Sequence, residues 1–192
     1  GEHAFRFCMN LENIRLSNKL SSLPHQLFSG CPKLRDLNVP SSVKTIYYSA
    51  IAWCDGLENL YLQDGLEEIV DEGPMLGVQG KLKTVNFPAT IKKVPGGVFN
   101  YSSLIKEFKL DPANTSFKVI DGVLCSKDGR TLYSVPYYNR TSYQVPEGIE
   151  VIAERVFAFL PMIGTINLSS TLKIIKSRAF QGCKSLRSLV IP

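Results

Sequence analysis

The sequence predicts an α/β solenoid, a right-handed coil of similar turns with one parallel β-sheet on its concave face. Three observations predict this class. Cys8, Cys31 and Cys54 are equally spaced, and a leucine follows each of them after three residues. After each cysteine the same alternating phrase recurs, for example between Leu34 and Val39. The 192 residues are 44% hydrophobic and 20% charged, the balance of a folded globular chain. A fixed period of this size is typical of stacked repeats that bury one continuous core.

One position, which we call the marker, sets the phase of the repeat. It lies three residues before the cysteine position and is aromatic or aliphatic in most turns. The step from Ile51 to Leu76 is longer than the cysteine period by two residues, and the step into Ser134 is longer by an insertion of twelve. All other steps equal the cysteine period, so we predict about eight turns in a single domain over residues 1–192. The markers are Phe5, Phe28, Ile51, Leu76, Phe99, Ser134, Phe157 and Phe180.

The residues nine and eleven positions after each marker are apolar or aromatic in every turn. This L-x-x-L-x-L phrase is typical of leucine-rich repeats. Its alternation predicts a short strand whose apolar side chains point into the core. Because so short a strand is unstable alone, the strands must stack. The inward positions are Ile14, Leu16, Leu37, Val39, Leu60, Leu62, Val85, Phe87, Phe108, Leu110, Tyr143, Val145, Ile166, Leu168, Leu189 and Ile191.

A second apolar pair in each turn, such as Leu66 and Ile69, predicts that the chain returns along the far side of the coil. We expect this convex side to be mostly irregular or short helical. A proline directly after the strand, as at Pro40 and Pro88, indicates the end of the strand, because proline lacks the N–H that a ladder needs.

The repeat is interrupted at about residues 116–136, which read SFKVIDGVLCSKDGRTLYSVP. Three short β-prone runs are separated there by Asp121-Gly122 and by Lys127-Asp128-Gly129. An Asp-Gly pair between such runs is a strong hairpin signal, so we predict an inserted β-meander. Two interpretations are open: a specificity element that projects from the coil, or a structural spacer.

The recurring phrases AFQGCKSLRSLVIP and LRDLNVPSSVKTI resemble the BspA-like leucine-rich repeats on surface proteins of gut and oral anaerobic bacteria and of some protists. The segment VIDGVLCSKDGRTLYSVP is similar to one that recurs in that family. The resemblance implies an extracellular or cell-surface location and adhesion to a host or matrix ligand. The chain departs from the family phrase at Ser134, Tyr137 and Arg140.

Several classes of function lack their signatures in this sequence. His3 and His25 stand alone, and there is no C-x-x-C pair, G-x-S-x-G phrase or P-loop. We therefore predict no enzyme, no catalytic residues, no metal and no cofactor. The net charge of +5 comes from basic and acidic residues that alternate along the chain, so we expect no nucleic-acid partner. Apolar runs of only a few residues indicate no membrane insertion of this segment.

Four of the five cysteines, Cys8, Cys31, Cys54 and Cys183, occupy the same repeat position. Serine or leucine fills it in other turns, which favours a free cysteine that acts as a compact buried side chain. Neighbouring turns could also bring two cysteines close enough for a bridge, and that alternative stays open.

The residues eight and ten positions after each marker should point away from the core and form two polar columns on the concave face. We predict a non-enzymatic binding module for cell-surface adhesion or for recognition of a host protein, matrix protein or glycan through these columns. Alternatively, the polar columns keep an exposed sheet soluble and the domain is a structural spacer without a ligand. The candidate binding residues are Asn13, Arg15, Asp36, Asn38, Asn59, Tyr61, Thr84, Asn86, Glu107, Lys109, Ser142, Gln144, Thr165 and Asn167.

Neither end of the chain has the atypical polar repeat that usually caps a solenoid. Phe5 is already a marker, and Pro192 directly follows a predicted strand. We therefore expect this chain to be a piece of a longer protein.

Overall fold

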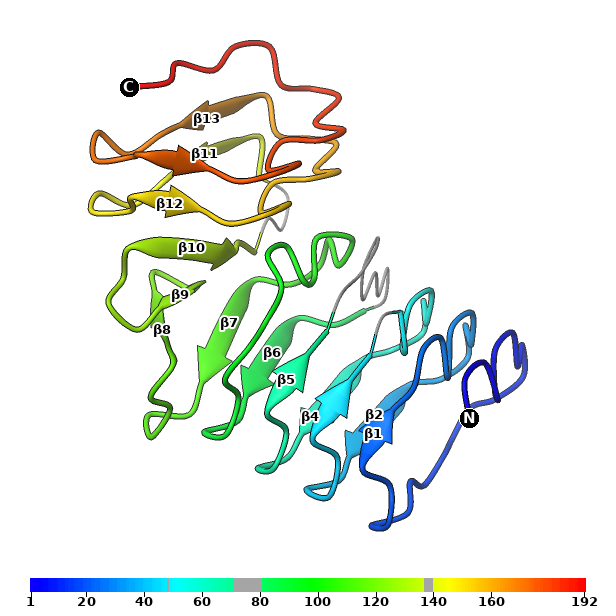
Figure 1. The fold of residues 1–192 in the computed structure, drawn as a ribbon. Coiled ribbons are helices and arrows are strands. Elements are labelled where there is room, and N and C mark those ends of the chain that lie inside the picture. Colours follow the sequence, from blue (N-terminus) through cyan, green and yellow to red (C-terminus); the bar gives the residue numbers. More distant parts are fainter. Residues whose placement is uncertain (48, 71–80, 137–139) are drawn as a thin grey trace.

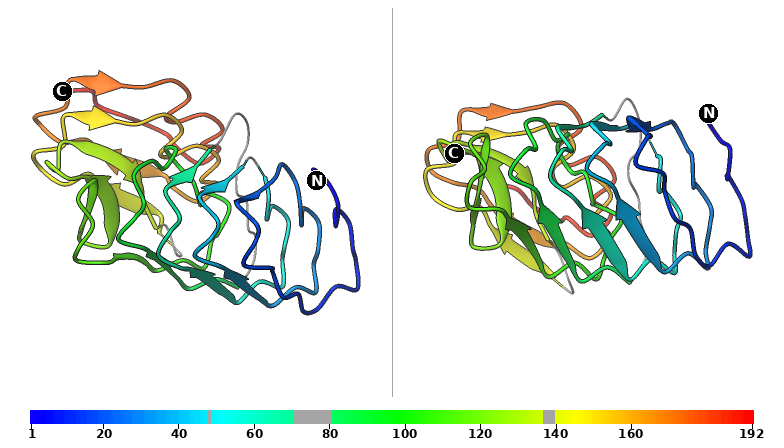
Figure 2. Two further views of the ribbon diagram at one scale, coloured as in Figure 1. Left: turned by 60° about the horizontal axis from the view of Figure 1, so that its bottom comes forward. Right: turned by 90° about the horizontal axis from the view of Figure 1, so that it is seen from below.

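The computed structural model describes residues 1–47, 49–70, 81–136 and 140–192. These residues form a β-solenoid of stacked turns (Figure 1). Figures 1 and 2 show the turns following one another from the N-terminus to the C-terminus, with a change in stacking direction at strands β8 (Phe117–Ile120), β9 (Val123–Ser126) and β10 (Thr131–Ser134). The predicted solenoid is therefore present.

The predicted α/β class and the helical convex side are wrong, because the described residues contain strands and turns but no helix. Every second backbone N–H of the marker segment around Phe28 bonds to the neighbouring turn, and the Ser29 N–H between them closes a tight turn on the Gln26 carbonyl. The Phe28 N–H donates to the Ala50 carbonyl over 2.8 Å, and the Gly30 N–H donates to Ala52 over 2.9 Å. Trp53, two residues after a marker, has a left-handed φ of 59°, which no α-helix accommodates. The lateral bonds thus replace the helical ones.

Six of the eight predicted L-x-x-L-x-L positions form strands, and we call the surface that they share the long-strand face. The strands pair in parallel, and the paired residues lie one repeat period apart, for example Leu37 with Leu60 and Val85 with Phe108. They form three two-stranded sheets and not the single predicted sheet. The strands are β2 (Asp36–Val39) with β4 (Asn59–Leu62), β6 (Thr84–Phe87) with β7 (Glu107–Leu110), and β11 (Ser142–Gln144) with β13 (Thr165–Asn167).

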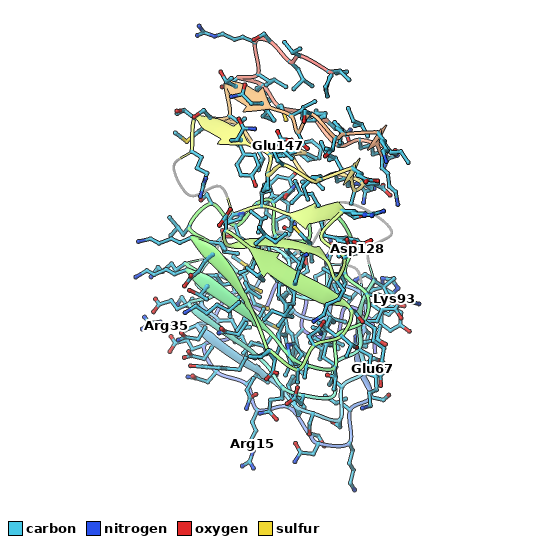
Figure 3. The ribbon with its side chains drawn as sticks, turned by 90° about the vertical axis from the view of Figure 1, so that its left-hand side faces the viewer. Arg15, Arg35, Glu67, Lys93, Asp128 and Glu147 are labelled. Atoms are coloured by element: carbon cyan, nitrogen blue, oxygen red, sulfur yellow. The ribbon has the colours of Figure 1, made fainter. Side chains whose placement is uncertain are left out.

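In five turns the latter residue of the second apolar pair lies in a further strand of two residues, where an irregular or short helical return was expected. These short strands pair in parallel with one another in two separate sheets, and their apolar side chains stack on one another, as Leu23, Ile46 and Ile69 do. Figure 3 places Arg35 at one edge of the molecule and Glu67 and Lys93 at the opposite edge, so the long-strand face and the short strands enclose the core between them. The short strands are β1 (Ser22–Leu23), β3 (Thr45–Ile46), β5 (Glu68–Ile69), β12 (Val151–Ile152) and β14 (Ile174–Ile175).

The predicted β-meander is confirmed as strands β8, β9 and β10, which pair antiparallel. Asp121 and Gly122, with φ of 49° and 79°, form the tight turn between β8 and β9. Strand β10 then pairs in parallel with β12, so the sheet order is β14-β12-β10-β9-β8. The insertion is therefore built into the wall of the solenoid.

Strand β9 separates the core into two hydrophobic clusters. Leu124 belongs to the cluster of the N-terminal turns, whereas Val123 and Cys125 belong to the cluster of the C-terminal turns. All three side chains are buried, because alternate residues of a strand point to opposite faces and both faces of β9 are covered. Tyr133 of β10 packs against both clusters. The meander thus acts as a partition between two cores.

The turn with the predicted marker Ser134 is incomplete. Its strands β11 and β12 lie at the predicted positions, but Ser134 is a buried residue of β10. The marker segments before and after it contact each other directly: the Tyr101 and Phe159 rings stack at 5.5 Å, and the buried Asn100 amide donates to the Arg155 carbonyl over 2.6 Å. The predicted marker Leu76 and Tyr137 lie outside the described residues.

Fifteen of the sixteen predicted inward side chains are buried or half-buried. Ile191 is the exception, with 65% of its surface exposed, because no further turn of this chain packs against it. The sequence periodicity therefore identifies the core correctly wherever two neighbouring turns are present.

Asn114 joins two turns just before the meander. Its side chain is buried and its Nδ2 donates to the carbonyls of Pro88, Ala89 and Ile91 over 2.9 to 3.3 Å. Its Oδ1 accepts the backbone N–H groups of Ser116 and Phe117. The amide therefore provides hydrogen-bond partners for backbone groups outside the strand pairing.

Replacing this amide should be costly. We expect Asn114→Ala to lower the free energy of unfolding by about 3 kcal/mol, because buried carbonyl and N–H groups lose their partners. Urea unfolding measures the loss. Asn167→Ala, at an exposed site on β13, is the matched control and should change stability by less than about 0.5 kcal/mol. Equal effects of the two substitutions would contradict this role of Asn114.

Candidate functional site

The long-strand face is hollowed along β4 and β6. Three adjoining hollows, of about 480, 530 and 460 Å³, lie there, and we call them together the β4–β6 groove. Asn86 lines all three of them, and Tyr61 lines two. One hollow lies toward the start of the two strands, at Glu58 and Lys83, and another lies toward their end, at Asp64 and Asp111. The groove therefore follows the strand direction.

The groove coincides with a break in the hydrogen-bonded ladder. Strands β2 and β4 pair residue by residue, and so do β6 and β7, but β4 and β6 belong to different sheets. No backbone hydrogen bond joins residues 59–62 to residues 84–87, all of which the structure describes. The step from Asn59, where β4 begins, to Thr84, where β6 begins, exceeds the repeat period by two residues. The break in the ladder thus coincides with the lengthened step.

The structure leaves thirteen of the fourteen predicted binding residues exposed and Thr84 half-buried. It brings six of them to the groove: Asn38, Asn59, Tyr61, Thr84, Asn86 and Lys109. The other eight do not line it: Asn13, Arg15, Asp36, Glu107, Ser142, Gln144, Thr165 and Asn167.

Several lining residues were absent from the prediction because they lie just outside the alternating part of the strand. Glu58 and Lys83 precede β4 and β6, and Gln63, Asp64 and Asp111 follow β4 and β7. The two predicted columns contain only the residues eight and ten positions after each marker. The lengthened step before Leu76 is the feature of the sequence that could have indicated the β4–β6 groove.

The polar columns fall into paired and unpaired side chains. Asn59 Nδ2 donates to Asp36 Oδ1 over 2.6 Å, and Gln63 Nε2 donates to Asn38 Oδ1 over 2.8 Å. These bonds run from turn to turn, as expected for a ladder that stabilises the coil.

By contrast, the side chains of Tyr61, Thr84 and Asn86 have no hydrogen-bond partner within the described part of the chain. Tyr61 is 54% exposed. Polar groups that face a hollow without a protein partner are available to a ligand.

Charged side chains around the groove are largely compensated by one another. Lys81 pairs with Glu58 at 3.1 Å, and Lys109 pairs with Glu107 at 3.1 Å. The short-strand side carries a separate ion-paired row, in which Lys92, at 2.7 Å, and Lys44 lower the pKa of Glu67. Neither surface concentrates charge of one sign.

The repeated cysteines have a structural role in the solenoid. The thiols of Cys31, Cys54 and Cys183 donate to the marker carbonyl of the preceding turn over 3.0 to 3.2 Å. All five cysteines are free in the structure. Burial raises the pKa of Cys54 and of Cys125 to about 12, so these thiols are held protonated. The described residues contain no group of three or more histidine, cysteine or carboxylate side chains that could hold a metal ion.

These raised pKa values predict a loss of stability at high pH. The unfolded thiols ionise near their ordinary pKa of 9.0, whereas the folded ones at Cys54 and Cys125 stay protonated to about 12. Their contribution is therefore complete below pH 9 and is lost as the pH rises from 9 to 12.

Urea titrations between pH 7 and pH 11 should show this decline and a shallower one in a variant with Cys54→Ala and Cys125→Ala. Burial also raises the pKa of Tyr143, but that phenol contributes only above its ordinary value of 10.0. Identical slopes for the two proteins below pH 10 would refute the explanation.

Parallel strands stacked one repeat period apart, with side-chain ladders between them, define a leucine-rich-repeat protein. The chain belongs to the BspA-type leucine-rich-repeat family: the description "BspA type Leucine rich repeat region" matches it in six copies, over residues 1–106 and 133–192. The unmatched residues include β7, β8 and β9. Among the described residues, no helix is long and apolar enough to cross a membrane. No curated protein sequence matches the chain.

Several solved structures of bacterial proteins share the fold. The pneumococcal vaccine antigen PcpA is 23% identical, with a TM-score of 0.73 over 91% of this chain and 43% of its own. A leucine-rich cell surface protein from Faecalibacterium prausnitzii is 22% identical, with a TM-score of 0.70 over 100% of this chain and 56% of its own. A leucine-rich repeat protein from Eubacterium ventriosum is 15% identical, with a TM-score of 0.66 over 84% and 49%. The chain thus spans about half the length of these proteins.

Proposed function

We propose that this chain is a non-enzymatic recognition module of a cell-surface or extracellular protein, which binds a host protein, matrix protein or glycan through the β4–β6 groove. One observation carries the proposal: Tyr61, Thr84 and Asn86 present unpaired polar groups to an open hollow. The ligand would replace the water that these groups bind in the free protein. The location and the role in adhesion are supported by membership of the BspA-type family and by the surface protein of similar fold.

A second candidate function is a structural spacer without a ligand. It is favoured by the turn-to-turn bonds of Asn59 with Asp36 and of Gln63 with Asn38, which satisfy part of the polar face internally. It is also favoured by the meander, which is paired into the wall of the solenoid and does not project from it as a separate binding element. The two functions differ in what they predict for the unpaired residues of the groove.

A binding screen against immobilised matrix proteins and glycans separates these functions. The recognition module should bind at least one of them, and a variant with Tyr61→Ala, Asn86→Ala and Lys109→Ala should bind at least tenfold more weakly. A variant with Ser142→Ala, Gln144→Ala and Asn167→Ala is the matched control, because these residues share the face but not the groove. Absence of any ligand, or equal loss in both variants, would favour the spacer.

A further inference from the structure

We propose, building on the function above, that the β4–β6 groove binds a neutral, linear oligosaccharide that lies along the strands. The groove has an elongated, open shape. Its hollows extend from Glu58 before β4 to Asp64 after it, roughly 20 Å at about 3.3 Å per residue of strand. Pockets for compact small molecules enclose most of the ligand surface. An elongated, open groove instead suits a chain of a few linked units.

The unpaired side chains of the groove match the hydrogen-bonding chemistry of sugar hydroxyls. The Asn86 amide both donates and accepts hydrogen bonds, and so do the hydroxyls of Thr84 and Tyr61. Sugar hydroxyls have the same double capacity and occur on adjacent carbons, so neighbouring groups of this kind can each be paired. The exposed Tyr61 ring adds an apolar surface with a polar tip, against which the C–H face of a sugar ring can stack.

The charged residues that line the groove balance one another. Three lysines and three carboxylates line the two end hollows: Glu58, Asp64, Lys81, Lys83, Lys109 and Asp111. The hollow between Asn38 and Asn86 is lined by no charged residue. The formal charges of these six residues sum to zero, and the side chains of Glu58 and Lys81 form an ion pair at 3.1 Å. A ligand with net charge would therefore gain little electrostatic binding energy from this surface, whereas a neutral ligand loses none.

The walls and floor of the groove favour an oligosaccharide over an extended polypeptide. Strong peptide and protein interfaces rely on anchors such as tryptophan or arginine that fill desolvated pockets. The floor of the groove includes Leu60 and Phe87, which are 5% and 2% exposed, so packed side chains close it. Shallow polar walls over a closed floor favour many hydrogen bonds over a few deep apolar anchors.

The test is isothermal titration of the protein with three sets of probes: neutral linear tetrasaccharides, acidic oligogalacturonates of the same length, and unstructured peptides from the matrix proteins used in the binding screen. We expect a neutral tetrasaccharide to bind, with an affinity that changes less than twofold between 0.05 and 0.5 M NaCl, because screening acts only on charge. Tyr61→Ala and Asn86→Ala should each weaken it at least tenfold. Tyr61→Phe should weaken it less than Tyr61→Ala does, because the ring is retained, and Asn167→Ala should leave it unchanged.

Failure of this inference differs from failure of the proposed function. Binding of the acidic probes alone, or of peptides alone, with loss in the Tyr61→Ala variant, would overturn the neutral oligosaccharide and keep the groove as the recognition site. Absence of binding to all three probe sets would overturn the inference. If the screen with matrix proteins and glycans also gives no ligand for the folded protein, the proposed function falls with it.

Discussion

The register between neighbouring turns is the constraint on which the rest of this structure depends. The segments around the markers Phe5, Phe28 and Phe157 donate every second backbone N–H to the same segment one turn later, as Phe28 does to Ala50 and Phe157 to Ala179, both over 2.8 Å. A step of one repeat period brings like side chains together, so apolar residues form continuous ladders and cysteine thiols reach the carbonyl of the turn before. Such a repeat is stabilised mainly by contacts between adjacent turns.

The two departures from this register account for the features that a uniform coil would lack. The insertion becomes a three-stranded meander whose middle strand divides the core, with Leu124 on one side and Cys125 on the other. The lengthened step coincides with the end of the ladder between β4 and β6 and with the groove at Tyr61 and Asn86. The first departure has a structural consequence, and the second supports a proposal about function.

Much of the fold could be predicted because it follows from local alternation and a fixed period. Strands such as β2 and β7 and the Asp121-Gly122 turn lie where these patterns place them. The convex side was harder to predict, because two apolar residues three positions apart fit a helical turn or a two-residue strand equally well. Only the lateral bonds from neighbouring turns decide between them, and these are not visible in one repeat.

The candidate site was predicted in part for a similar reason. Alternation identified Tyr61, Thr84 and Asn86 as outward residues, and the structure leaves them exposed or half-buried. It could not distinguish them from Asn38 and Asn59, whose hydrogen bonds depend on side chains in adjacent turns. The break in the sheet is likewise a property of two strands together, so the lengthened step in the sequence suggested an irregularity without showing its geometry.

Amide hydrogen exchange across β4 tests most directly whether the sheet is open at the groove. The N–H groups of Asn59 and Gln63 donate to the Arg35 and Val39 carbonyls, so those of Leu60 and Leu62 point toward β6, where no backbone partner meets them. Measured by NMR, Leu60 and Leu62 should exchange at least tenfold faster than Asn59 and Gln63. Equal protection of all four amides would mean that β4 and β6 are paired, and it would contradict this account.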